Sequence, residues 1–302
     1  MESHAKALGD IKVSVIIATM ASSNRARLLV RAVESIRASS TTTVAIIVVV
    51  NGRENDAAVC NWLIAQPDVR YEYMEEPSLP KAILRGRSLV ATEFFATLDD
   101  DDEYLPLAID IRMHAMDADA ATDIVVTNGY RMTENVDTVC YQDLVNVSGH
   151  PLQTLMVLPW LSSCNALYRT ASVGSEYFEN SHPYGEWTWL AFKLAIKRKK
   201  IISLDALTFR IHDTAVSLSK TLAYASAQRE LLERMLGLSP PPDVVKLIGK
   251  KMGAIYHQFS NSSLKMGNRA QALQWHLRSL IKPGGFRYLS YSRHFFMRTR
   301  SD

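Results

Sequence analysis

Four consecutive aspartates, Asp99 to Asp102, directly follow the apolar run from Phe94 to Leu98. Carboxylates this close repel one another, which costs stability unless a cation or hydrogen-bond donors offset their charge. Mg²⁺ and Mn²⁺ prefer oxygen ligands, and Mg²⁺ commonly binds one or two protein carboxylates together with substrate phosphates. The run therefore predicts a divalent metal site that also holds phosphate. The alternative is a solvated acidic loop that stabilises the positive end of a helix beginning near Tyr104.

The segments ahead of the aspartates have the pattern of buried strands that alternate with helices. The first of them, VSVIIAT at 13–19, is apolar, rich in β-branched residues and without polar alternation, as in a parallel strand covered on both faces. We expect strands at 13–19, 44–50, 69–73 and 94–98, with helices at 25–37, 56–65 and 81–90. This alternation is typical of a doubly wound α/β sheet, in which ligands bind at the carboxyl ends of the strands. The aspartates follow the fourth strand, at such an end.

Beyond the aspartates the pattern is less regular and then becomes entirely helical. Residues 129–181 contain only short strand-like pieces, which favours a substrate-facing region. We expect helices at 105–118 and 186–197, and strands at 123–127, 154–158, 165–168 and 201–211. After residue 218 we expect helices only, at 221–236, 244–264, 270–281 and 286–297. The change in pattern predicts a domain boundary near residue 218.

The composition is that of a globular protein. Of the 302 residues, 47% are hydrophobic and 22% are charged, and a chain of this length can bury a large core. The cysteines at 60, 140 and 164 are far apart and lack metal-ligand spacing, which indicates neither disulfides nor a zinc site. The N-terminus lacks the apolar core of a signal peptide, and no apolar run approaches the ~20 residues of a membrane helix. We therefore expect a cytoplasmic protein, or one peripheral to the inner face of a membrane.

Two segments are strongly basic. Residues 197–200 follow a predicted helix, where cations complement the carbonyl-rich end, and no RNA-binding motif accompanies them, so we expect no nucleic-acid partner.

From Lys265 to the end there are eight Lys and Arg residues and one acid, Asp302. This tail interleaves cations with aromatic residues, a pattern that suits an anionic membrane surface. The alternative is a helical cap packed on the rest of the chain. The tail residues concerned are Arg278, Lys282, Arg287, Arg293, Arg298 and Arg300, with Trp275, Phe286, Tyr288, Tyr291, Phe295 and Phe296.

Three segments together resemble the GT-A glycosyltransferases, most closely family 2, whose members are inverting enzymes with nucleotide-sugar donors. The first is VSVIIAT followed by Asn24-Arg25, and the second is VVVNG. The third, LDDDDEYLP, is the most specific, because it matches the family's Leu-Asp-x-Asp-Asp followed by an aromatic residue, an apolar residue and proline. The resemblance covers residues 13 to about 218. It implies an α/β fold of the GT-A type, with a mostly parallel, Rossmann-like sheet flanked by helices.

The resemblance also implies a domain organisation. Residues 1–218 would form the catalytic domain, with a donor half at about 13–128 and an acceptor half at about 129–218. Residues 219–302 would form an all-helical C-terminal extension.

Within the acid run the resemblance assigns separate roles. Asp99 and Asp101 would be the ends of the family's Asp-x-Asp element, with Asp101 binding the metal and Asp99 facing the donor ribose or a metal-bound water. Asp100 would occupy the variable place between them in the donor site, and Asp102 would support the turn. The implied cofactor is Mn²⁺ or Mg²⁺, which stabilises the charge that develops on a departing nucleoside diphosphate.

Further donor-site residues follow from the same resemblance. Thr19 and Asn51, each at the end of a predicted strand, would hold the nucleoside. Asn51 stands where the family usually has an aspartate, although an amide can still hydrogen-bond a base or ribose. Lys81 lies near where relatives place a basic donor-site residue; a helix-surface lysine is the alternative.

The acceptor half of the family motif is only partly matched. Glu186 corresponds to its glutamate, but Trp187 replaces the aspartate that is the catalytic base in several relatives. We expect Glu186 to act as the base toward the acceptor hydroxyl; the alternative is a carboxylate that stabilises its helix. His212 resembles the family's closing element, in which a neutral imidazole can approach the metal or diphosphate, or it is structural. Trp160, Trp187 and Trp189 could stack on sugar faces or pack in the core.

These expectations combine into a metal-dependent inverting glycosyltransferase. It would move a sugar from a nucleotide-sugar donor to a hydroxyl of a saccharide or lipid-linked saccharide, in the synthesis of bacterial lipopolysaccharide, capsule or exopolysaccharide. A nucleotidyltransferase and a non-catalytic sugar-nucleotide-binding module are the alternatives. A phosphatase with an aspartate nucleophile fits less well, because its acids would follow the first strand.

Overall fold

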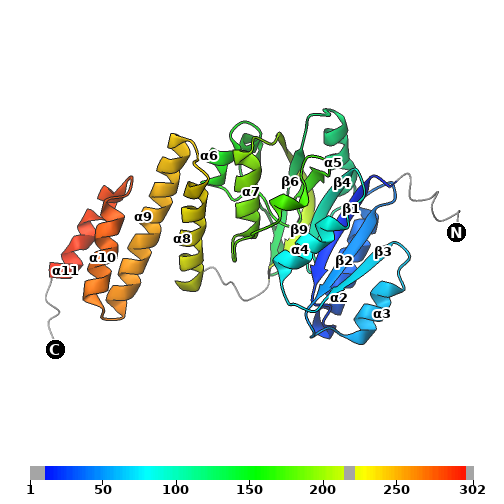
Figure 1. Ribbon diagram of the computed structural model, residues 1–302, viewed down its shortest axis with the longest axis horizontal. Helices are drawn as coiled ribbons and strands as arrows, with labels where there is room; N and C mark the ends of the chain where they lie inside the picture. Colours follow the sequence, from blue (N-terminus) through cyan, green and yellow to red (C-terminus); the bar gives the residue numbers. More distant parts are fainter. Residues whose placement is uncertain (1–10, 214–221, 297–302) are drawn as a thin grey trace. The chain divides into compact units, whose positions relative to one another are not determined.

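The computed structural model describes residues 11–213 and 222–296. These residues divide into two compact units, one of residues 11–181 and 186–213 and the other of residues 182–185 and 222–296. The first unit is α/β and the second is built of helices (Figure 1). The predicted boundary near residue 218 lies outside the described residues and stays a prediction.

Nine strands of the described residues form a single sheet in the α/β unit. The order is β3-β2-β1-β4-β8-β6-β9-β5, with β7 paired to β6. The bounds are β1 Val13–Thr19, β2 Ala45–Asn51, β3 Val69–Met74, β4 Phe94–Asp99, β5 Glu103–Tyr104, β6 Ile124–Thr133, β7 Val136–Val139, β8 Ala166–Arg169 and β9 Ile201–His212.

The first half of the sheet, from β3 to β4, is parallel, as predicted. β1 lies between β2 and β4, with Val15 opposite Ile46 on one side and Ala96 on the other. All seven residues of β1 are buried. The strands keep their register to the end, where Ala18 lies opposite Asp99. The carboxyl ends of β1, β2 and β4 therefore lie along one edge of the sheet, next to the aspartates.

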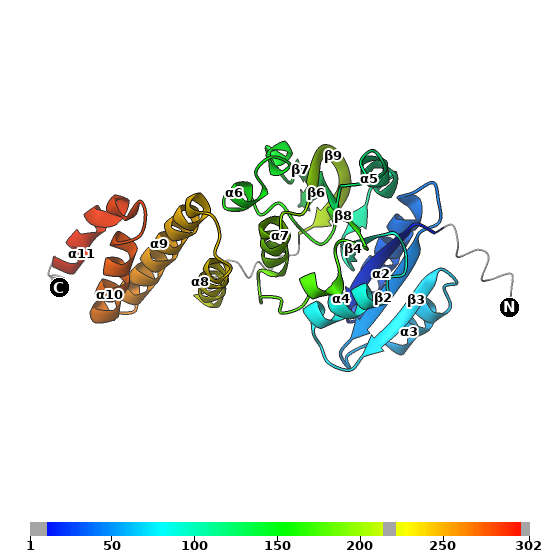
Figure 2. The same ribbon diagram turned by 45° about the horizontal axis from the view of Figure 1, so that its top comes forward.

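The second half of the sheet is mixed rather than parallel (Figure 2). β8 runs antiparallel to β4 and β6, whereas β9 runs parallel to β6. The short β5, directly after the aspartates, pairs antiparallel with the end of β9, with Glu103 opposite Arg210. The turn that carries the aspartates is therefore held between β4 and β9.

Helices cover both faces of the parallel half. On one face, α2 packs Leu29 and Val33 into the same core as Val15 of β1. On the other face, α4 lies so close that a Cβ on Gly86 would sit 2.4 Å from Cγ2 of Ile16. Burial of a Leu, Val or Ile side chain contributes about 1.5–3 kcal/mol each, so this double cover stabilises the strands that deliver the site. The helix bounds in this unit are α2 Ala26–Ala38, α3 Ala57–Ile64, α4 Leu79–Ser88, α5 Ala108–Asp117, α6 Pro151–Leu155 and α7 Glu186–Ile196.

Two predictions for the α/β unit are wrong. The segment 154–158 is not a strand, because Pro151 starts the short helix α6 and the amide of Thr154 donates to the backbone oxygen of His150 at 2.9 Å. No helix begins at Tyr104, because that residue lies in β5 and α5 begins only at Ala108. Pro106 explains the delay, since the residue before a proline is disfavoured in helical conformation.

The second unit contains α8 Leu222–Gly237, α9 Pro242–Lys265, α10 Arg269–Leu280, the 3₁₀ segment η6 Gly285–Ser292 and α11 Arg293–Phe296. The prediction of a single α-helix at 286–297 is therefore wrong, because most of this segment is a 3₁₀ helix. A tight reversal precedes it: Gly284 has a φ of 74°, and a Cβ on Gly285 would lie 2.3 Å from the backbone oxygen of Leu280.

Among the helices of the described residues, none combines the length and apolar character needed to cross a membrane.

Candidate active site

Three of the four aspartates bring carboxylates together at the end of β4. One carboxylate oxygen from each of Asp99, Asp101 and Asp102 lies within 4.8 Å of those of the other two. A set of ligands made only of carboxylate oxygens suits a hard divalent cation such as Mg²⁺ or Mn²⁺. These residues therefore fit the predicted metal, which would also offset the repulsion among them.

Asp100 is held apart from this cluster by two residues near the start of the chain. The hydroxyl of Thr19 donates to its Oδ2 at 2.5 Å, and Nε of Arg25 donates to the same atom at 3.2 Å. Nη2 of Arg25 pairs with the other oxygen of Asp100 and also lies 3.0 Å from Oδ2 of Asp101. Hydrogen bonding to Asp100 raises the pKa of Arg25 despite its partial burial. Arg25 is thus a permanent positive charge beside the acids. Asp100, predicted to bind the donor, already joins the end of β1 to the residue just before α2.

Asp99 and Asp102 are each fixed by a partner distant in sequence. The hydroxyl of Ser163 donates to Oδ2 of Asp99 at 2.6 Å. The backbone N–H of His212 donates to Oδ1 of Asp102 at 3.1 Å. The backbone N–H of Asp102 also donates to the backbone oxygen of Asp99 at 3.2 Å, which closes the turn. Ser163, ahead of β8, and His212, at the end of β9, therefore set the direction of these two carboxylates.

The crowding of these acids changes their protonation. Loss of solvent, together with the charges of Asp101 and Asp100, raises the pKa of Asp99 to about 6. Loss of solvent and the charge of Asp99 raise the pKa of Asp102, which is 4% exposed, to about 8. Without a cation Asp102 therefore retains its proton at neutral pH, and a bound cation would displace it.

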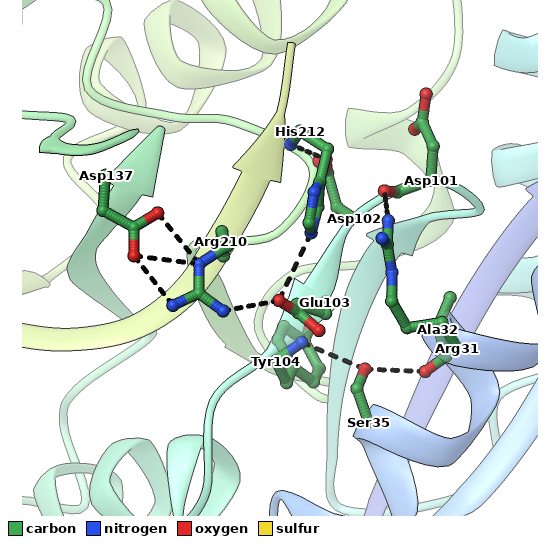
Figure 3. Close-up of polar contacts among 10 residues, drawn as sticks. All are labelled: Arg31, Ala32, Ser35, Asp101, Asp102, Glu103, Tyr104, Asp137, Arg210 and His212. Carbon is green, nitrogen blue, oxygen red and sulfur yellow. Dashed lines mark hydrogen bonds and ion pairs between the residues drawn. The ribbon is translucent and has the colours of Figure 1, made fainter. Parts of the chain in front are cut away.

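One side of the turn is anchored by α2, as Figure 3 shows. Arg31 donates through Nη2 to the backbone oxygen of Asp101. Further along, the hydroxyl of Ser35 accepts a hydrogen bond from the backbone N–H of Tyr104 at 3.0 Å and donates to the backbone oxygen of Ala32 at 2.7 Å. The helix that packs on β1 thus also holds the segment leaving the aspartates.

The other side of the turn is anchored by β9 (Figure 3). Arg210 forms ion pairs with Glu103 at 2.7 Å and with Asp137 at 2.8 Å. Nε2 of His212, the last residue of β9, lies 3.3 Å from Oε1 of Glu103, while its backbone contacts Asp102. Burial, with the positive charge of a nearby arginine, lowers the pKa of His212. The imidazole is therefore neutral at pH 7 and lies beside the acids; its predicted contact with the metal stays a prediction.

Asn51 ties together the strand ends where the nucleoside is predicted to bind. Its Nδ2 donates to the backbone oxygen of Thr19 at 3.0 Å, and its Oδ1 accepts from the backbone N–H of Ser78 at 3.1 Å. Ser78 caps α4, so the amide joins β1, β2 and that helix. A pocket of about 580 Å³ adjoins this junction, large enough for a small ligand. Its lining residues are Met20, Gly52, Arg53, Glu54, Glu75, Glu76 and Pro77.

Lys81 lies on the surface of α4 beside this pocket. Its ammonium group pairs with Glu76 at 2.6 Å, and both side chains are 57% exposed. Such a pair contributes little to stability, so Lys81 is held only weakly. Its predicted donor contact would require it to exchange Glu76 for a phosphate.

Glu186 begins α7 and lines a small cavity of about 30 Å³ with Trp187, Leu79 and Pro80, the last two from the start of α4. No described residue donates a hydrogen bond to its carboxylate or forms an ion pair with it. This differs from the aspartates, all of which are engaged. Glu186 thus has the freedom that a base needs, and its role stays a prediction.

The three tryptophans have different surroundings. Trp160 is fully buried, and its Nε1 donates to the backbone oxygen of Pro151 at 3.0 Å, so the structure places it in the core rather than at a sugar face. Trp189 is 6% exposed and stacks on Phe192 at 6.3 Å. Trp187 is partly exposed and lines the cavity beside Glu186. Trp187 is therefore the one of the three with most surface available to a ligand.

Sequence reasoning missed three residues that hold the aspartates: Arg25, Arg31 and Ser163. Arg25 belongs to the Asn24-Arg25 pair after the first strand, so its position was visible, but its partner was not. Ser163 lies in the irregular stretch before β8, where no pattern distinguishes it from other polar residues. Residues of this kind are recognised only by what they contact.

Comparison with known proteins gives matches at two levels. The family model described as "Glycosyl transferase family 2" matches residues 14–174, just over half of the 302-residue chain. No curated protein matches. Among solved structures, that of S. aureus TarS residues 1–349 in complex with UDP-GlcNAc is 13% identical, with a TM-score of 0.61, and the match covers 97% of this chain and 94% of that chain.

Two further TarS structures match this chain with similar identity and TM-score. The same fragment in complex with UDP is 12% identical, with a TM-score of 0.57 and the same coverage of both chains. The longer S. aureus TarS structure is 14% identical, with a TM-score of 0.57, and is matched over 80% of this chain and 43% of that chain. At this identity the likeness shows the fold, and it confirms the predicted GT-A class. The family match, the shared fold and the acid cluster at the end of β4 agree. The chain therefore belongs to glycosyl transferase family 2 and is a glycosyltransferase.

Proposed function

We propose that the protein is a metal-dependent, inverting glycosyltransferase that moves a sugar from a nucleotide-sugar donor to a hydroxyl group of a saccharide. The observation that carries the proposal is the cluster of Asp99, Asp101 and Asp102, within 4.8 Å, at the carboxyl ends of the parallel strands. In α/β sheets this edge is where ligands bind. The pocket beside Asn51 at the same edge has room for a nucleoside.

The proposed cofactor is Mn²⁺ or Mg²⁺, held by Asp101 with Asp99 and Asp102 beside it. When bound, such an ion offsets the negative charge that develops on the leaving nucleoside diphosphate. The protein's own contribution is to hold the carboxylates in place before the donor arrives, through Ser163, Arg25 and the backbone of His212. TarS has been solved with UDP-GlcNAc and with UDP, which makes uridine diphosphate sugars the first donors to test.

Glu186 is the proposed base. It would accept the proton of the acceptor hydroxyl as that oxygen bonds to the anomeric carbon, while the bond from that carbon to the diphosphate oxygen breaks on the opposite face. This displacement inverts the anomeric configuration. The carboxylate is free of partners among the described residues and lies at a cavity lined by aromatic side chains, which supports the role.

The proposed acceptor is a saccharide or lipid-linked saccharide, and the proposed pathway is bacterial surface polysaccharide synthesis. We place the reaction in the cytoplasm or at the inner face of the membrane. The three cysteines are free thiols, which fits a reducing compartment.

The test is a panel of nucleotide sugars with Mn²⁺, measuring the thermal shift and the slow hydrolysis of the donor. We expect a shift with at least one uridine diphosphate sugar that depends on Mn²⁺ and is lost in Asp101→Ala. Glu93→Ala, which alters an exposed acid paired with Arg169, is the control. If no nucleotide or nucleotide sugar shifts the wild-type protein in a metal-dependent way, the proposal fails. Release of pyrophosphate would indicate nucleotidyl transfer, and binding without turnover would indicate a non-catalytic module.

A further inference from the structure

The helical unit exposes a stripe of aliphatic side chains on α10. Leu273, Leu277 and Ile281 are 40%, 54% and 80% exposed. They are spaced four residues apart, which places them on one face of the helix. The opposite face is buried through Ala272, which is 0% exposed, and His276, which is 1% exposed. These three residues, termed here the α10 stripe, therefore present aliphatic surface to solvent.

The aromatic residues of this unit are arranged in the opposite way. Trp275 stacks on Tyr256 with a ring distance of 5.6 Å, and Phe295 stacks on His276 at 5.3 Å. Most of the aromatic side chains expected to face a membrane thus pack within the unit. Among the aromatic side chains that the structure describes here, Phe286 is the exception, at 77% exposed, and it follows the stripe by only five residues.

The charge around the stripe is of one sign. The sequence from 266 to 296 contains no Asp or Glu. Arg269 and Arg278 are exposed on α10, and the guanidinium of Arg278 lies over the ring of Trp275 at 4.8 Å. The described cations of this segment are Arg269, Arg278, Lys282, Arg287 and Arg293. Arg298 and Arg300 lie outside the described residues.

We propose that the α10 stripe and its flanking cations dock on an anionic lipid bilayer. Aliphatic side chains would enter the boundary between headgroups and acyl chains, and the arginines would pair with lipid phosphates. A second copy of the chain fits this face poorly, because a symmetric contact would place cations against cations with no carboxylate to pair with them. An acidic polymer would use the cations but leave the stripe in water.

The experiment is flotation of the full chain at low salt with vesicles of phosphatidylcholine and phosphatidylglycerol in equal parts, and with vesicles of phosphatidylcholine alone. We expect binding to the anionic vesicles only. Arg278→Gln with Lys282→Gln should weaken it about fivefold for each cation removed. Leu277→Ser with Ile281→Ser should weaken it at least ~10-fold, from the lost apolar burial.

Matched controls exist elsewhere on the surface. Val157 is 80% exposed, like Ile281, so Val157→Ser controls for loss of an exposed aliphatic side chain. Lys197→Gln with Arg198→Gln controls for loss of two exposed cations. Both controls should bind anionic vesicles like the wild type. All variants should keep wild-type donor hydrolysis, so a failure here is distinct from a failure of the proposed transfer activity.

Three results would overturn the proposal. Wild-type protein that stays unbound on anionic vesicles excludes the bilayer. Stripe variants that bind like Val157→Ser exclude the α10 stripe. Sedimentation that shows a dimer, dissolved by the stripe variants, would assign the face to a second copy.

Discussion

The aspartate turn after β4 and the first turn of α7 both present carboxylates, but they differ in what holds them. Every acid of the turn contacts a residue at least 64 positions away, as with Ser163 and Asp99, or 75 positions for Arg25 and Asp100. Glu186 has no such contact among the described residues. Its position follows only from the start of its helix.

This difference indicates a division of labour. Preorganised charges act by holding a ligand without rearrangement, and their loss affects binding and stability together. A base must change its protonation during the reaction, and strong ion pairs would oppose that change. Substitutions in the turn should therefore alter binding and stability, whereas a substitution at Glu186 should alter turnover alone.

The strongest test of this division is Glu186→Gln. We expect kcat to fall about 10²–10⁴-fold, the usual contribution of a general base. Donor affinity, measured by titration with Mn²⁺ present, should change less than about twofold. Glu179→Gln, on an exposed acid before the same helix, should leave both unchanged. Near-normal turnover of Glu186→Gln with intact donor binding would remove the base assignment.

Loss of Arg25 should destabilise the turn rather than slow the chemistry. Arg25→Met leaves the buried Asp100 carboxylate without its positively charged partner, at a cost of about 1–3 kcal/mol in the free energy of unfolding. The double variant with Asp100→Asn should recover most of this loss, because the stranded charge is gone. Denaturant unfolding measures both.

The matched control for that cycle is Arg53→Met. Arg53 pairs with Glu75, and their side chains are 77% and 66% exposed. A pair of this kind contributes about 0–1 kcal/mol. If the two arginine variants lose equal stability, the turn is no better organised than the surface.

The raised pKa values of the turn predict a pH dependence of metal binding. Asp99 and Asp102 titrate at about 6 and about 8 in the folded protein, above the ordinary carboxyl value. Mn²⁺ must displace these protons, so its affinity should rise by up to about tenfold per pH unit across this interval. Without metal, the contribution of Asp99 and Asp102 to the free energy of unfolding should change in the opposite direction. This contribution is fully present below the unfolded pKa near 4 and is lost as pH rises toward about 8.

Titration with Mn²⁺ at several pH values, together with unfolding in a chelator, measures both trends. Asp102→Asn removes the group with the higher pKa, so it should flatten the upper part of each curve. A metal affinity independent of pH in the wild type would contradict the protonated cluster.

The smallest expected effect is at Lys81, whose partner Glu76 lines the pocket proposed for the donor. Lys81→Met should leave the free energy of unfolding within about 1 kcal/mol, because its pair with Glu76 is exposed. Donor affinity should fall about fivefold, which corresponds to the net value of about 1 kcal/mol for one hydrogen bond. The control is Arg85→Met, which lies on the same helix as Lys81 and loses its ion pair with Glu72. An unchanged donor affinity would make Lys81 a surface residue only.

Much of the parallel half of the fold could be predicted. β1 matches its prediction at both ends, and β2 and β4 differ by one residue or less at each end. Strands buried on both faces need continuous apolar runs, and such runs can be recognised from consecutive residues in the sequence. The less regular region between β6 and α7 was harder, because segment 154–158 has strand-like composition while Pro151 starts a helix just before it.

For the site, the sequence identified the acids but not their partners. The motif LDDDDEYLP and the resemblance to family 2 pointed to Asp99 and Asp101, and the structure adds Asp102 to their cluster. Neither Ser163 nor Trp160 could be assigned in this way. A polar or aromatic side chain has the same local signature whether it faces a ligand, an aspartate or the core.

By itself, then, the sequence determined the apolar strands, the acid run that follows the fourth of them, and the basic character of the C-terminal segment. These depend on composition and short-range spacing. Only the tertiary structure decided that Arg25 neutralises Asp100, that Glu186 stands without a partner among the described residues, and that aliphatic rather than aromatic side chains are exposed on α10. Each of these depends on residues that meet only when the chain has folded, because burial and charge pairing are properties of neighbours in space.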